Sequence, residues 1–276
     1  MKFLSTLLIA LACTASYSAC ASPNITDKEG ADYFNLQAEL PKETNFINAE
    51  AKYISLTPEN CPKENLSIGS YGVAAQGSKT VSLKGEQSED HREINQRIPL
   101  SYQRGECNMW LYNIVLVAAS TYGPEYWQEA TTAIMIDVFK QHPQNAPDFD
   151  ANGILAINQS CSWLFRIDGK NISKLLFCSV VDPDGRARTP LHNWKAIQSS
   201  THITTGINKL AGKTIKLNLH ISDEEHPTFE DPWVKTVKGW QLCETKEDTP
   251  FCKTPISVSK FKMNSRVCTV YPNCTE

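Results

Sequence analysis

The cysteines constrain the fold of this chain more than any other feature. The sequence holds ten, and eight of them lie between residues 61 and 274. An even set of this size is typical of a disulfide-bonded protein that folds in an oxidising compartment. No pair has the C-x-x-C spacing of a zinc site and the histidines are scattered, so we expect four disulfides, no metal ion and no cofactor. The eight are Cys61, Cys107, Cys161, Cys178, Cys243, Cys252, Cys268 and Cys274.

The N-terminal segment indicates which compartment this is. Lys2 precedes a short apolar run, residues 3–12, and small residues follow it. This order is that of a secretory signal peptide for Sec-type export, and the run is shorter than the about 18 apolar residues that a membrane span needs. We therefore predict a signal peptide over residues 1–19, a polar tether over residues 20–35 and a folded protein beyond it.

Two kinds of processing fit this segment. Cleavage after Ala21 gives a free protein. Alternatively, residues 18–20 (SAC) resemble a bacterial lipobox, in which Cys20 carries the lipid, although Tyr17 departs from the usual pattern. Cysteine parity favours lipidation of Cys20, because losing Cys13 and setting Cys20 aside leaves eight of the ten cysteines to pair. The lipid would anchor the protein to a membrane.

The composition is that of a globular protein without a strong charge bias. Hydrophobic residues make up 41% of the chain and charged residues 21%, and the net charge is −3 without a cluster of Lys and Arg. Binding to a phosphate backbone needs concentrated positive charge, so we expect no nucleic-acid partner.

Strand patterns dominate the folded part. Residues 215–221 and 97–103 alternate between apolar and polar side chains. Residues 109–119 are almost continuously apolar, which predicts a central strand buried on both faces. Residues 125–141 fit a helix or a strand, and the strand-rich surroundings favour a strand. Shorter strand candidates are residues 53–56 and 79–84.

The best internal boundary lies at residues 142–153, which contain two Pro and one Gly. On either side of it a Cys is followed by Trp-Leu-aromatic and then Ile, at residues 107–114 and 161–167, which suggests a repeat. We expect a mainly antiparallel, all-β fold with few helices, in two β-sandwich-like units over residues 36–145 and 146–276.

A hairpin in the second unit predicts one disulfide. If residues 168–171 (DGKN) form the loop, Ile167 faces Ile172 and Cys161 faces Cys178, within disulfide reach. A two-residue loop would place Cys161 opposite Leu176 instead. Nearest-neighbour pairing gives Cys61–Cys107, Cys243–Cys252 and Cys268–Cys274, one of 105 connectivities open to eight cysteines.

Signatures of catalysis are lacking in the sequence. It has no G-x-S-x-G, and the glycine spacing before Lys213 is wrong for a P-loop. His220 and His226 flank an acidic run, which we interpret as a solvated loop rather than a catalytic site. We therefore expect a protein without enzymatic activity. Candidate partner contacts are this acidic run and the Trp that we expect to be most exposed: Asp223, Glu224, Glu225 and Trp233.

The cysteine and tryptophan pattern over residues 100–276 resembles that of a known family. The segments are 105–107 (GEC), 161–166 (CSWLFR), 175–178 (LLFC), 239–243 (GWQLC) and 261–274 (FKMNSRVCTVYPNC). They look like those of proteobacterial periplasmic lipoproteins that are encoded beside type VI secretion phospholipase effectors and act as their immunity proteins. The resemblance implies a membrane-anchored periplasmic protein that binds and neutralises a cognate phospholipase, with no catalytic residue of its own.

Two other classes stay open. One is a secreted disulfide-rich glycoprotein or binding module. The other is a periplasmic hydrolase, which needs a clustered acid–base pair that the sequence does not assemble. The sequons on which the first class depends are Asn24, Asn65, Asn158, Asn171 and Asn273.

Overall fold

Strands, several of them long, build most of the part of the chain that the structure describes, and the fold is all-β as predicted. The computed structural model describes residues 26–62, 68–69, 72–73, 76–87, 92–181, 202–228, 231–245, 251–253 and 255–274. The predicted signal peptide and the predicted lipid site at Cys20 lie outside these residues. Within them the only α-helix is α2 (Ile207–Leu210), with two single 3-10 turns, η1 (Pro58–Asn60) and η2 (Tyr126–Gln128).

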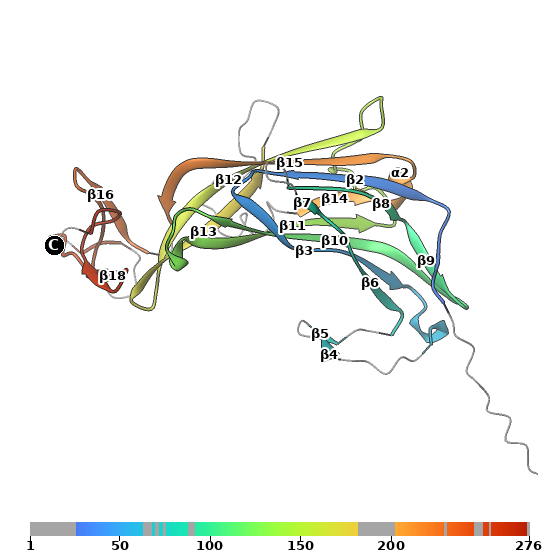
Figure 1. Ribbon diagram of the computed structural model, residues 1–276, viewed down its shortest axis with the longest axis horizontal. Coiled ribbons are helices and arrows are strands. Elements are labelled where there is room, and N and C mark those ends of the chain that lie inside the picture. The colour runs from blue at the N-terminus through green and yellow to red at the C-terminus, as the bar shows by residue number, and fades with distance from the viewer. Residues whose placement is uncertain are drawn as a thin grey trace, which may run out of the picture.

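Two large sheets form the body of the molecule (Figure 1). The first has the order β1 (Lys28–Glu29), β9 (Ser101–Arg104), β10 (Cys107–Thr121), β11 (Glu129–Phe139) and β14 (His202–Gly206), and β3 (Thr44–Ser55) joins β6 (Ser78–Ser82) to β10. The second has the order β19 (Arg266–Cys268), β18 (Phe261–Met263), β13 (Asn171–Val180), β12 (Ile154–Asp168), β15 (Thr214–Pro227), β2 (Tyr33–Leu40), β8 (Arg92–Pro99) and β7 (Glu86–Gln87). Two short hairpins form separate two-stranded sheets: β4 (Ile68–Gly69) with β5 (Gly72–Val73), and β16 (Trp233–Thr236) with β17 (Gly239–Leu242).

The predicted division at residues 145 and 146 is wrong, because both sides of it share each sheet. In the second sheet β2 pairs in parallel with β15, and in the first β11 pairs in parallel with β14. One hydrophobic core runs from Phe34 to Leu217. The predicted tether is also too long, since Lys28–Glu29 and the start of β2 already belong to the sheets.

Strand β10 is central but is not buried on both faces as predicted. Its side chains alternate, so that Met109 and Leu111 are buried while Trp110 and Tyr112 are exposed. An irregularity between Leu111 and Asn113 then shifts the register against β3. One face of β10 therefore packs into the core. The other face leaves the side chains of Trp110 and Tyr112 in solvent.

The hairpin formed by β12 and β13 has the predicted register. Cys161 pairs with Cys178 at a Cα separation of 3.9 Å, and the ladder continues to Asp168 and Asn171. Closing this short loop stabilises the fold by about 3 kcal/mol in the chain-entropy account. The structure contains the same four disulfides that the sequence predicts: Cys61–Cys107, Cys161–Cys178, Cys243–Cys252 and Cys268–Cys274.

Residues 231–274, named here the C-terminal module, pack on the end of the β12–β13 hairpin. Their small core gathers Phe261 and Tyr271 around Phe165 of β12. Two of the four disulfides lie in this module. In Figure 1 the module occupies one end of the long axis, and β9 and the start of the coloured ribbon occupy the other. In the part of the chain that the structure describes, no helix is long and apolar enough to cross a membrane.

Candidate interaction surfaces

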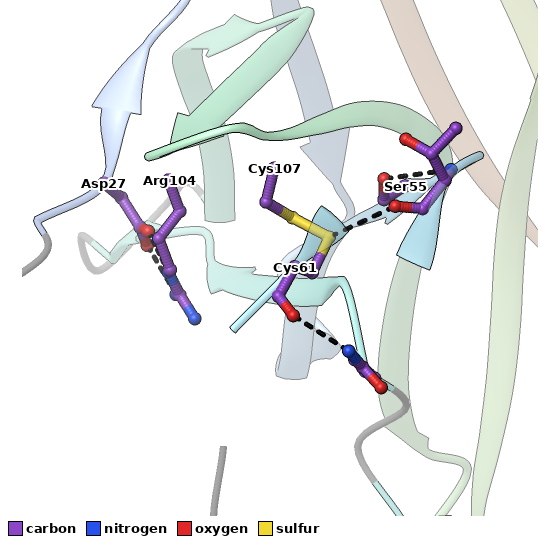
Figure 2. Close-up of a disulfide and its surroundings, with 7 residues drawn as sticks. Asp27, Ser55, Cys61, Arg104 and Cys107 are labelled. Carbon is purple, nitrogen blue, oxygen red and sulfur yellow. Dashed lines mark hydrogen bonds and ion pairs between the residues drawn. A yellow bond between two sulfur atoms is a disulfide. The ribbon is translucent and has the colours of Figure 1, made fainter. Parts of the chain in front are cut away.

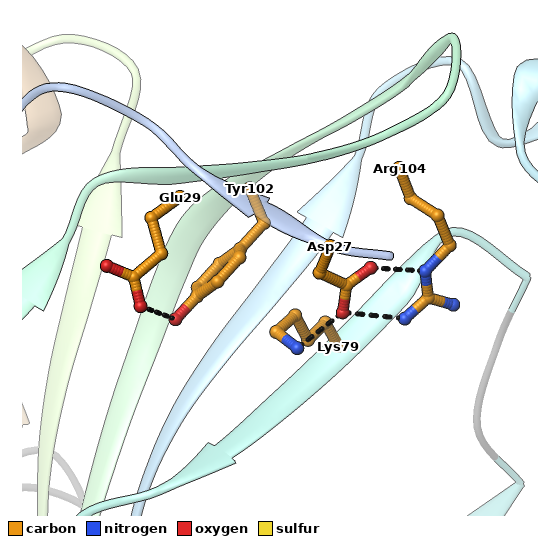
Figure 3. A network of polar contacts seen from close by, with 5 residues as sticks. All are labelled: Asp27, Glu29, Lys79, Tyr102 and Arg104. Atoms are coloured by element: carbon orange, nitrogen blue, oxygen red, sulfur yellow. Dashed lines mark hydrogen bonds and ion pairs between the residues drawn. The ribbon is translucent and has the colours of Figure 1, made fainter. Parts of the chain in front are cut away.

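Five polar residues fasten the N-terminal strand to the end of the first sheet (Figure 3). The Asp27 carboxylate accepts hydrogen bonds from Nε and Nη2 of Arg104, the latter at 2.9 Å, and lies 2.5 Å from Nζ of Lys79. The Tyr102 hydroxyl donates to Oε1 of Glu29 at 3.1 Å. These five residues, named here the N-terminal clamp, fix the point at which the chain enters the fold.

A disulfide stiffens the same end of the sheet (Figure 2). Cys107 begins β10 opposite Arg104 of the clamp and is joined to Cys61, which follows η1. The carbonyl of Cys61 accepts a hydrogen bond from the Gln76 side chain at 2.8 Å. The clamp and the disulfide together make this end of the molecule a firm attachment point.

The clamp should depend on pH through Asp27. The hydrogen bond from Arg104, supported by Lys79, lowers the pKa of Asp27 to about 2. A carboxyl whose pKa is lower in the folded state stabilises the fold above its unfolded value, near 3.8, and loses this contribution as the pH falls through about 2.

We expect Asp27→Asn to lower the free energy of unfolding at pH 7 by about 1 kcal/mol, a value discounted for solvent screening. The difference from the wild type should shrink as the pH falls below about 4 and be small at pH 2, where the wild-type carboxyl is about half protonated. Urea unfolding at both pH values measures it. Asp32→Asn, at an exposed carboxylate of the same segment, is the control. Equal stability of Asp27→Asn and wild type at pH 7 contradicts the role of the clamp.

The acidic run is part of strand β15 and not the predicted loop. Its pairing with β12 is irregular: Cys161 faces Ile221, whereas Trp163 faces Glu225, so residues 222–224 bulge out of the ladder. Asp223 and Glu224 are therefore exposed, as a partner contact requires.

Glu225 points the other way, toward the body of the molecule, and its role as a partner contact stays a prediction. Its carboxylate accepts a hydrogen bond from the Tyr271 hydroxyl at 2.7 Å and another from Nζ of Lys174. The Lys174 side chain is fully buried, and its Nζ lies 3.4 Å from the centroid of the Tyr122 ring. Burial lowers the pKa of Lys174, while the bond to Glu225 opposes this shift.

The network locks the C-terminal module in place. Lys174 belongs to β13, Glu225 to β15 and Tyr271 to the module. Burial, and then the bond to Glu225, raise the pKa of the Tyr271 hydroxyl well above its usual value, so it remains a donor at neutral pH. The bulge with Asp223 and Glu224 therefore lies next to a firmly held module.

Trp233 is not the exposed residue that the sequence suggests. Its ring packs edge-to-face on Phe165 and Phe261, with centroids 5.1 and 5.4 Å apart. The aromatic rings of the module thus form its core. The large apolar side chains that the module exposes are instead Val237, in the turn between β16 and β17, with Phe251, Ile256 and Val267.

An acid–base pair that the sequence did not reveal lies on the outer face of the first sheet. Nδ1 of His202 lies 2.7 Å from Oδ2 of Asp137, whose Oδ1 accepts a hydrogen bond from the Asn113 side chain at 2.8 Å. The parallel pairing of β11 with β14 brings these residues together across 65 positions, without a local sequence signal. His202 faces Met135 across the ladder. No group of His, Cys, Asp and Glu among the described residues could hold a metal ion.

Comparison of the chain with protein-family models, with curated proteins and with solved structures finds no match. Its function is therefore inferred from its residues and their geometry.

Proposed function

We propose that this protein is an immunity protein of the periplasm, held at a membrane by a lipid on Cys20, and that it binds and neutralises a type VI secretion phospholipase effector. The cysteine and tryptophan pattern supports this proposal through its resemblance to such lipoproteins. The signal-peptide pattern supports export, and the four disulfides are compatible with an oxidising compartment.

The observation that carries a binding role is the surface of the C-terminal module. Val237 is fully exposed and Phe251 is 73% exposed. The acidic bulge lies where β15 meets the same module, next to the bond between Glu225 and Tyr271. An apolar centre with a polar rim is the usual arrangement of a protein–protein interface. Because disulfides and the Lys174–Glu225 pair hold the module, little conformational entropy is lost on binding.

A second candidate function follows from His202 and Asp137. A histidine oriented by a carboxylate can act as a general base, so this pair supports a periplasmic hydrolase. A turnover assay on phospholipids separates the two functions. A hydrolase consumes the lipid and loses activity in His202→Ala, whereas an immunity protein hydrolyses nothing and inhibits its partner.

The compartment tests the proposed function in cells. The proposal predicts a phospholipase effector encoded in the neighbouring gene, and this effector is directed to the periplasm and co-expressed with the protein. We expect the full-length protein to abolish toxicity and a form lacking residues 1–19 to leave it unchanged, because the inhibitor then stays in the wrong compartment. Equal amounts of both forms, checked by immunoblot, are the control. Protection by the cytoplasmic form contradicts the proposal.

A further inference from the structure

An apolar strip lies on the outer face of the first sheet, close to the N-terminal clamp. Trp110 on β10 faces Ile54 on β3, and Leu56 follows β3 on the same side by alternation. Tyr112 is the next outward residue of β10. These four residues, named here the apolar strip, are between 38% and 55% exposed. Grouped exposed side chains of this size mark an interaction surface.

The chemistry of the strip suits the interface of a bilayer. Trp and Tyr combine an apolar ring with a polar N–H or O–H, and they gather where a membrane meets water. In the row that crosses the strip, Ser78 beside Ile54 and Ser101 beside Trp110 carry no charge. Contact with lipid headgroups therefore desolvates no ionised group in this row. Lys52, two residues before Ile54 on the same face, is charged and lies 3.7 Å from Glu50.

The clamp brings this strip close to the predicted anchor. Strand β1 is separated from β10 by β9 alone, which is about 10 Å at the usual strand spacing. Cys20 precedes Asp27 by seven residues, which span at most about 25 Å when fully extended. A lipid on Cys20 would hold the clamp end of the domain within this distance of the bilayer.

We propose that the apolar strip rests on the phospholipid bilayer that holds the lipid of Cys20. This inference rests on the lipid anchor of the proposed function. Four side chains are too few for durable membrane binding alone. The lipid anchor keeps them close to the bilayer, so their effective concentration at its surface is high and a weak contact is enough. The contact then lies at the clamp end of the sheet, and the C-terminal module lies at the opposite end of the long axis in Figure 1.

Fluorescence quenching by lipid tests the orientation. The lipidated protein is reconstituted in vesicles of phosphatidylethanolamine and phosphatidylglycerol whose acyl chains are brominated and quench only the Trp rings that they touch. We expect quenching in the wild type, its loss in Trp110→Phe and its persistence in Trp240→Phe, which alters the C-terminal module. Cys20→Ser, without the lipid, should show none. Absence of quenching in the wild type, or equal quenching in Trp110→Phe, overturns the proposal.

A second variant separates this inference from the proposed function. Ile54→Ser/Trp110→Ser should remain membrane-bound through its lipid, lose the quenching and inhibit the phospholipase as the wild type does. If it loses inhibition instead, the strip is a docking site for the effector and the membrane contact is refuted. If the wild type shows the expected quenching but inhibits no phospholipase, the proposed function fails and the orientation stands.

Discussion

Glu225→Gln should lower the free energy of unfolding by about 3 kcal/mol, because it leaves the buried ammonium of Lys174 without a counter-charge. Lys174 is fully shielded from solvent, so water cannot replace the lost carboxylate. The same substitution removes the ionised acceptor of the Tyr271 hydroxyl and so loosens the C-terminal module.

The neighbouring residue offers a matched control. Glu224→Gln removes the same charge one position earlier, on a side chain that is 81% exposed, and should change stability by less than about 0.5 kcal/mol. Urea unfolding of both variants at pH 7 measures the difference. Equal stabilities would show that the Lys174–Glu225 pair does not hold the module.

Cys61→Ala/Cys107→Ala should cost about 4 kcal/mol, the largest disulfide effect in the chain, because this bridge closes the longest of the four loops. The bridge ties the first residue of β10 to the segment after η1, beside the N-terminal clamp. Its loss should therefore free the clamp end before the rest of the sheet.

Cys268→Ala/Cys274→Ala is the comparison, since its bridge spans only six residues and should contribute about 2 kcal/mol. Thermal unfolding with hydrogen exchange reports both the total loss and where it begins. A Cys61–Cys107 variant as stable as the Cys268–Cys274 variant contradicts the chain-entropy account of this bridge.

Local patterns predicted the strands and one disulfide correctly. The loop of the β12–β13 hairpin sets its register, so the pairing of Cys161 with Cys178 follows from residues that are close in sequence. The alternation over residues 215–221 likewise gives the inward face of β15. Such features depend on neighbouring residues, and a single sequence contains them.

Features that depend on distant pairing were not predicted. The parallel contact of β15 with β2 joins strands far apart in the chain, so a core that spans both sides of residue 145 was mistaken for two units. The bulge that exposes Asp223 and turns Glu225 inward arises only when β15 meets β12. Trp233 is covered by Phe165 and Phe261, both remote in sequence. His202 meets Asp137 in the same way.

Inhibition of the purified phospholipase tests the central claim most directly. Hydrolysis of phospholipid by the effector that the proposed function predicts is measured against increasing amounts of the mature, oxidised protein. We expect activity to reach zero at one inhibitor per enzyme. Val237→Glu/Phe251→Glu should weaken binding at least about 30-fold, as expected for the loss of a hot spot of about 2 kcal/mol. Ile47→Glu, at an exposed apolar residue of β3, should inhibit like the wild type. Full phospholipase activity in a molar excess of the wild-type protein contradicts the account.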